Sequence, residues 1–179
     1  MRRAPNPKSL VYSVVLAGFV FVSPVFGVTL AEVNKTPISD AVVRERLQSY
    51  LRQIGHEKLS PVRMATLRKA VLKKLIEEEL LYQDGLTHRI AVSESEIVAG
   101  VLKVQNRFAS AEAFHEALSE EDLNLEDIRK GVSRSIVIQK SWARFSKMSE
   151  PDRASRLREM TEGADIRVFN VTAPVASYK

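Results

Sequence analysis

The 179-residue sequence contains no cysteine at all. This absence excludes disulfides, thiol chemistry, thiolate metal sites and attachment of a lipid through an N-terminal cysteine. A chain of roughly 150 residues can nevertheless bury enough apolar surface to fold without crosslinks. Length and composition therefore predict one compact domain, or one domain with a small appendage, stabilised by an apolar core.

The residue patterns that carry catalysis are also missing. The three histidines, His56, His88 and His115, are far apart, and each lacks a second metal ligand at helical spacing. No glycine-rich phosphate loop and no G-x-S-x-G motif occur. Three consecutive glutamates at 77–79 fan around a helix instead of converging, and we interpret them as surface carboxylates. The sequence thus predicts no catalyst, no metal site and no cofactor.

The net charge of +5 comes from 27 basic and 22 acidic residues, and it is concentrated at the start of the chain. Arg2, Arg3 and Lys8 precede residue 28, with no acidic residue, so the remainder carries 24 basic against 22 acidic residues. In that remainder opposite charges follow each other at helix-surface spacing, as they do around residues 73–78. This pattern predicts a solvated surface and argues against nucleic-acid binding.

Residues 1–27 have the organisation of an export signal. A basic start is followed by an uncharged run at 10–22, then by Pro24 and, at the predicted cut, Gly27. Cleavage after Gly27 would leave residues 28–179 in the periplasm or otherwise outside the cytoplasm, with no membrane span. The alternative is an uncleaved membrane anchor, because 10–26 is only slightly shorter than a spanning helix.

The rest of the chain is predicted to be mainly α, with about six helices. Apolar residues recur at three and four positions, and a serine or asparagine stands before most of these runs. The predicted caps are Ser39, Ser60, Ser93, Ser110, Asn124 and Ser149, and the predicted stops include Gly55, Gly85 and Gly163.

Two short segments at the ends of this helical region read as strands. Residues 28–33 precede a turn at 34–37, and residues 164–171 alternate apolar and polar side chains. Neither strand is stable alone, so we expect them to pair and to bring the two ends together. Residues 172–179 are predicted to be a loose C-terminal tail.

Five aromatic residues are candidates for an apolar groove that binds unfolded polypeptide. Two interpretations stay open. These residues either belong to the core, as aromatic residues in a helical domain usually do, or they line an exposed apolar surface that binds polypeptide. The candidates are Tyr50, Phe108, Phe114, Trp142 and Phe145.

Four stretches resemble the N-terminal chaperone module of the SurA-type periplasmic chaperones, which are related to the parvulin-type foldases. They are EVNKTPIS, LRKAVLKKLIEEELLYQDGLTHRIAVSESEI, FASAEAFHEALSEEDLNLEDIRKGVSRSIVIQK and LREMTEGADIRVF. Together they cover nearly all of residues 28–171. In the family a prolyl-isomerase domain usually precedes the closing segment, whereas residues 147–151 here connect the two parts directly.

The resemblance implies a chaperone module without the enzyme. Its expected partners are unfolded exported polypeptides, including outer-membrane proteins, which it would hold without ATP. Two alternatives remain at this stage, namely an assembly subunit that binds one specific envelope partner and a minimal prolyl isomerase. Neither the oligomeric state nor the client preference follows from the sequence.

Overall fold

The computed structural model describes residues 28–53, 59–146 and 148–169. The predicted signal peptide, the predicted helix stop at Gly55 and the predicted C-terminal tail lie outside these residues.

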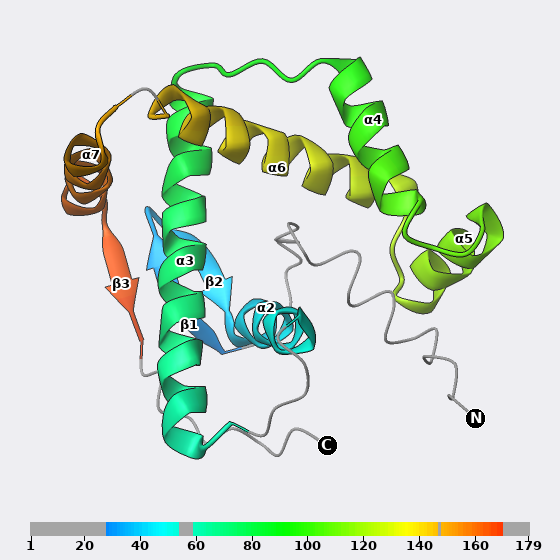
Figure 1. Ribbon diagram of the computed structural model, residues 1–179, viewed down its shortest axis with the longest axis horizontal. Helices are drawn as coiled ribbons and strands as arrows, with labels where there is room; N and C mark the ends of the chain where they lie inside the picture. The colour runs from blue at the N-terminus through cyan, green and yellow to red at the C-terminus, as the bar shows by residue number, and fades with distance from the viewer. Residues whose placement is uncertain (1–27, 54–58, 147, 170–179) are drawn as a thin grey trace.

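The described residues form six helices and three short strands, which confirms the mainly α prediction (Figure 1). None of these helices is long and apolar enough to cross a membrane. In chain order the elements are β1 (Thr29–Val33), β2 (Thr36–Ser39), α2 (Asp40–Gln53), α3 (Pro61–Thr87), α4 (Glu94–Gln105), α5 (Ala111–Glu120), α6 (Leu125–Arg144), α7 (Glu150–Glu162) and β3 (Ile166–Val168).

The predicted helix caps account for where the helices begin. At five starts the cap side chain accepts a hydrogen bond from a backbone N–H in the first turn, a group that the helix itself leaves unsatisfied. At α4 and α6 the bond is reciprocated, because a carboxylate three residues on accepts from the cap's N–H. These caps are Ser60, Ser93, Ser110, Asn124 and Ser149. The sixth predicted cap, Ser39, precedes α2 directly, and its hydroxyl likewise accepts from the Val42 N–H at 3.4 Å.

The predicted pairing of the two end strands is confirmed, but the sheet has a third strand that was not predicted. Strand β1 lies between β2 and β3, and both pairings are antiparallel. The predicted turn at 34–37 is in fact only two residues long. Asn34 and Lys35 have φ of 49° and 71°, the left-handed conformation that a tight hairpin requires. Thr36 and Pro37 therefore already belong to β2.

The helices and the sheet enclose two separate apolar cores. One lies between the sheet, α2 and α3, and its fully buried members include Leu30, Val43 and Leu47. The other joins α4, α5 and the first half of α6 around Phe114 and Ile128. Figure 1 shows α6 crossing the upper end of α3 and carrying α4 and α5 at its far end. Helix α6 thus connects a base, built on the sheet and α3, with an arm, built on α4 and α5.

Gly85 has a different role from the predicted one. It does not end α3, which continues to Thr87, but lies inside the helix where α6 crosses it. A methyl group at this position would overlap Val137 Cγ1 and lie 2.5 Å from Ser141 Oγ. The missing side chain lets the two helix backbones approach closely, which sets the position of the arm relative to the base.

We expect Gly85→Ala to destabilise the protein. Alanine favours a helix over glycine by about 1 kcal/mol, so propensity alone would raise stability. Overlap with Val137 and Ser141 should outweigh this gain, because overpacking a filled contact costs about 1 to 3 kcal/mol. Urea unfolding of the single variants and of the Gly85→Ala/Val137→Ala double variant measures the balance. The smaller Val137 side chain should remove most of the penalty, and a stabilised single variant would contradict the close crossing.

Candidate functional site

Helix α4 exposes an apolar surface to solvent, and we call its residues, Val98, Ala99 and Leu102, the α4 face. Val98 and Leu102 are one turn apart, with 43% and 49% of their surface exposed. The adjacent side of α4 packs on the arm core through Ile97, Val101 and Val104. Residues 97–102 contain no polar side chain. Six consecutive apolar residues surround the helix, so they cannot all lie on the one side that packs on the core, and this run is the sequence signal for an exposed apolar face.

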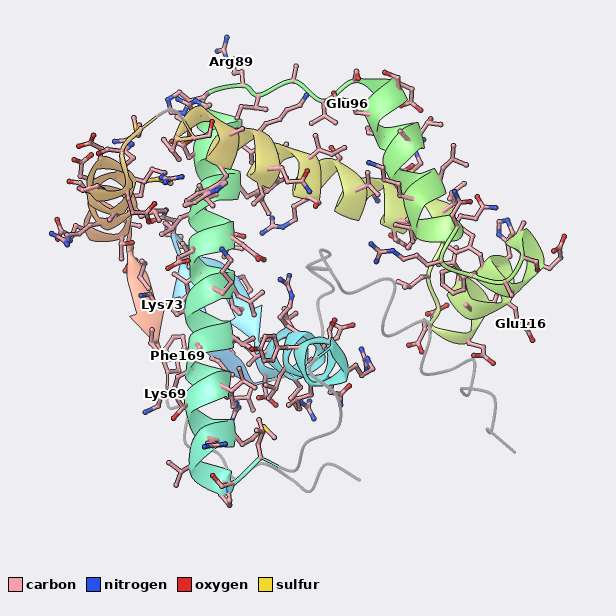
Figure 2. The ribbon with its side chains drawn as sticks, in the orientation of Figure 1. Lys69, Lys73, Arg89, Glu96, Glu116 and Phe169 are labelled. Carbon is pink, nitrogen blue, oxygen red and sulfur yellow. The ribbon has the colours of Figure 1, made fainter. Side chains whose placement is uncertain are left out.

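Close packing and charge pairs hold α4 firmly against α6. Gly100 lies so near α6 that a methyl group there would overlap Val132. At the start of α4, Glu96 pairs with Lys140 of α6 at 2.7 Å, and the Lys140 ammonium also donates to the Ala91 carbonyl at 2.8 Å. Figure 2 shows Glu96 where the connecting segment enters α4. The α4 face is therefore presented on a fixed support.

The carboxylate of Glu96 is held in its charged form. Hydrogen bonds from Lys140 and from the Ser93 backbone and hydroxyl lower its pKa to about 2. The same carboxylate completes the capping box of α4, because the Ser93 N–H donates to it at 2.9 Å. One side chain thus both starts α4 and attaches it to α6.

The three glutamates 77–79 fan around α3 as predicted, but two of them are not free surface carboxylates. Glu78 forms a two-pronged pair with Arg46 of α2, with both N···O distances at 3.0 Å. Glu79 is buried and pairs with Arg134 of α6, whose guanidinium also lies 4.0 Å over the ring of Tyr82. Two consecutive residues of α3 therefore pair with two different helices, Glu78 with α2 and Glu79 with α6.

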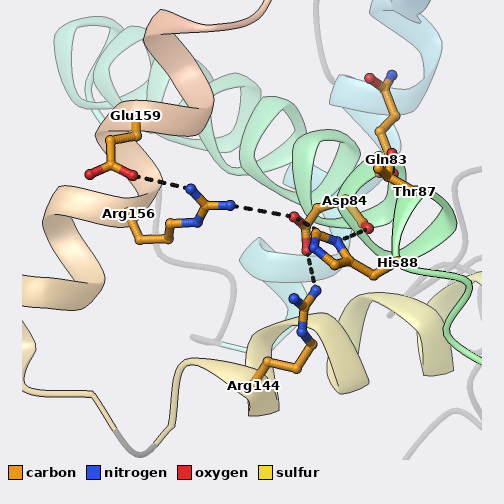
Figure 3. A network of polar contacts seen from close by, with 7 residues as sticks. All are labelled: Gln83, Asp84, Thr87, His88, Arg144, Arg156 and Glu159. Carbon is orange, nitrogen blue, oxygen red and sulfur yellow. Dashed lines mark hydrogen bonds and ion pairs between the residues drawn. The ribbon is translucent and has the colours of Figure 1, made fainter.

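A third carboxylate on α3 pairs with α6 again and adds a third helix, α7. The nearly buried Asp84 side chain pairs with Arg144 of α6 at 2.8 Å and faces Arg156 of α7 at 4.0 Å (Figure 3). His88, which caps the C-terminus of α3 one turn after Asp84, places its Nδ1 at 3.3 Å from the same carboxylate. Arg156 is in turn held by Glu159 of its own helix. Together with Glu78 and Glu79, Asp84 makes α3 the charged hub to which α2, α6 and α7 attach.

Comparison with known proteins agrees with this architecture. Residues 3–141 match the family model described as the SurA-like N-terminal domain, which is more than half of the chain. The chain belongs to the SurA-like N-terminal domain family. No curated protein matches the sequence in a direct comparison. The family match ends within α6, so α7 and β3 lie beyond the matched residues.

The five aromatic candidates do not gather on one surface of this SurA-like domain. Phe114 and Phe145 are almost completely buried, so they belong to the packing and cannot line an accessible groove in this conformation. Phe108 packs partly buried against the arm core, edge-on to Phe114 at 5.3 Å. Tyr50 on α2 and Trp142 on α6 are 44% and 40% exposed. Only these last two remain candidates for direct contact with a bound chain.

Trp142 stands beside the α3–α6 crossing. Its ring meets the buried Phe145 edge-on at 6.5 Å, so one side of the indole is supported by the fold while the residue stays partly open to solvent. The domain therefore offers at least two separate apolar contacts, the α4 face and Trp142. Such a distribution suits several weak contacts with an extended chain better than one deep pocket for a small ligand.

One carboxyl group of the base has a pKa well above its ordinary value. Burial raises the pKa of Glu45 on α2 to about 7, a rise that Glu121 at the end of α5 increases and that Arg46 and Arg52 oppose. Of the histidines, His88 joins the Asp84 network, His115 packs beside Phe114, and His56 lies outside the described residues.

We expect Glu79→Gln to cost about 3 to 5 kcal/mol of unfolding free energy, because it leaves the buried guanidinium of Arg134 without its counter-charge. Glu77→Gln is the matched control on the same helix. Among the described residues, Glu77 pairs with the exposed Lys73 and Lys74 at 4.0 and 3.9 Å, so its loss should cost less than about 0.5 kcal/mol. Urea unfolding at neutral pH compares them, and equal effects would contradict the α3 hub.

Proposed function

We propose that this SurA-like domain holds unfolded exported polypeptides, including outer-membrane proteins, without ATP and without catalysis. The observation that carries the proposal is the exposed α4 face on a rigidly anchored helix in a protein of this family. Exposed apolar side chains that the fold leaves without a partner are typical of protein interaction sites. The export-type leader of the sequence supports action in the periplasm or elsewhere outside the cytoplasm.

The proposed mechanism depends on weak contacts that act together. Each exposed side chain, such as Leu102 or Trp142, would cover one apolar side chain of a client and lower the concentration of free aggregation-prone chain. Once one contact forms, it raises the effective concentration of the client's other apolar residues at the remaining contacts. Several weak contacts therefore bind a client more tightly than any one of them alone. Release then follows when the client folds and withdraws its apolar residues, and it requires no nucleotide.

Dilution of a urea-unfolded outer-membrane porin tests this function. We expect the purified protein to suppress aggregation, measured by light scattering, without ATP. The double variant Val98→Ser/Leu102→Ser should lose most of this suppression and keep its unfolding midpoint, because both side chains are exposed. Val62→Ser is the matched control, since Val62 on α3 is 76% exposed but lies outside the α4 face.

Two results would contradict the proposal in different ways. Absence of suppression at several-fold excess of the protein would exclude general holding and favour an assembly subunit that binds one folded partner. Full suppression by the double variant would leave the function standing but move the site away from α4. An unrelated unfolded soluble protein, used as a second client, measures how broad the activity is.

A further inference from the structure

We propose that the outer edge of β3 binds an extended client segment by adding a strand to the sheet, and that the segment alternates apolar with acidic residues. The inference rests on the proposed holding function, and it names a second contact and the chemistry of the chain that makes it. Strand addition uses backbone hydrogen bonds, so it tolerates many client sequences.

The hydrogen bonds between β1 and β3 determine which groups of β3 are left free. The Asn34 N–H donates to the Asp165 carbonyl, and the Phe169 N–H donates to the Leu30 carbonyl, both at 2.8 Å. In an antiparallel pair such bonded positions alternate with non-bonded ones. Ile166 and Val168 therefore direct their N–H and C=O groups away from β1, and no strand in the part of the chain that the structure describes lies on that side.

The opposite edge of the sheet is protected, which makes the open edge of β3 distinctive. On β2, Pro37 lies opposite Glu32 of β1. The backbone N–H and C=O groups of Glu32 point toward β3, where Glu32 lies opposite Arg167, so they do not bond to β2. Position 37 therefore points outward, and proline removes the N–H that would stand there. Proline on an edge strand is a common protection against unwanted pairing. Strand β3 has no such residue.

The side chains around the β3 edge indicate the composition of the added strand. Val168 is 56% exposed and Phe169 is also exposed, so apolar client residues have partners there. Arg167 pairs with Asp165 at 3.0 Å, and its side chain stays 62% exposed, so its positive charge is also accessible to a client. Figure 2 shows Lys69 and Lys73 leaving α3 on the flank along which β3 runs, with Phe169 between them in this view. The basic surroundings favour acidic residues in the client.

The same charge argues against a second copy of this chain as the occupant. Two β3 strands paired antiparallel with Ile166 opposite Val168 would place each Arg167 directly opposite the other, and facing like charges destabilise a strand pair. With a client, the residue opposite Arg167 occupies a non-bonded pair, in which side chains approach most closely. We therefore expect an acidic client residue opposite Arg167. The apolar residues on either side of it would form backbone hydrogen bonds with Ile166 and Val168.

Binding of a short fluorescent peptide in which valine and glutamate alternate tests this assignment. Methylation of the valine amides should weaken binding to the full-length protein by about tenfold or more, because those N–H groups would bond to β3. Methylation of the glutamate amides should change affinity less than about twofold, since those groups would face solvent. Replacing glutamate with lysine should also weaken binding. Equal effects of the two methylations would overturn the proposal.

Substitutions in β3 test the same edge from the protein side. Val168→Pro removes an outward N–H that no described residue accepts, so it should weaken peptide binding while far-UV circular dichroism and the unfolding midpoint stay unchanged. Val168→Ala, which keeps the N–H, should bind more tightly than Val168→Pro. If Val168→Pro fails to fold, the methylated peptides on the wild-type protein still decide. Normal suppression of porin aggregation together with indifference to methylation would reject the edge and leave the holding function intact.

Discussion

The architecture depends on the crossing of α3 and α6. This contact is close because Gly85 leaves room for Val137 and Ser141, and it joins the base to α6, the helix that carries the arm. The two apolar cores have no residue in common, so their relative position is determined by α6 and not by a continuous interior. A small change at the crossing would therefore move every residue of the arm, including the α4 face.

Charge pairs complement this packing by defining which helix attaches where. Removing one partner of a buried pair is costly, so each pair favours one arrangement of helices even where its net contribution to stability is small. The buried pair of Glu79 with Arg134 attaches α6 in this way, and the more exposed pairs add Glu78 to α2, Asp84 to α6 and α7, and Glu96 of the arm to α6. Apolar residues can then stay exposed on α4 without rearrangement of the fold, as a surface that binds other chains requires.

The local signals in the sequence predicted the fold well and the site poorly. Caps such as Ser93 and Asn124 act within one turn, so pattern alone located them. The strand β2 was missed because Thr36 and Pro37 have the composition of a turn, and only the left-handed Asn34 and Lys35 make the turn short enough. The burial of Glu79 and Phe114, and the exposure of Val98, depend on which helix packs where, and periodicity along one helix does not contain that information.

Site-specific photo-crosslinking tests the central claim, that a rigid frame presents the α4 face to unfolded chains. A photoreactive amino acid replaces Leu102 in one protein and the exposed Lys74 of α3 in a control. We expect crosslinks to an unfolded porin from position 102, few from position 74, and none to the folded porin at either position. Equal crosslinking from both positions, or crosslinks to the folded porin, would contradict the account.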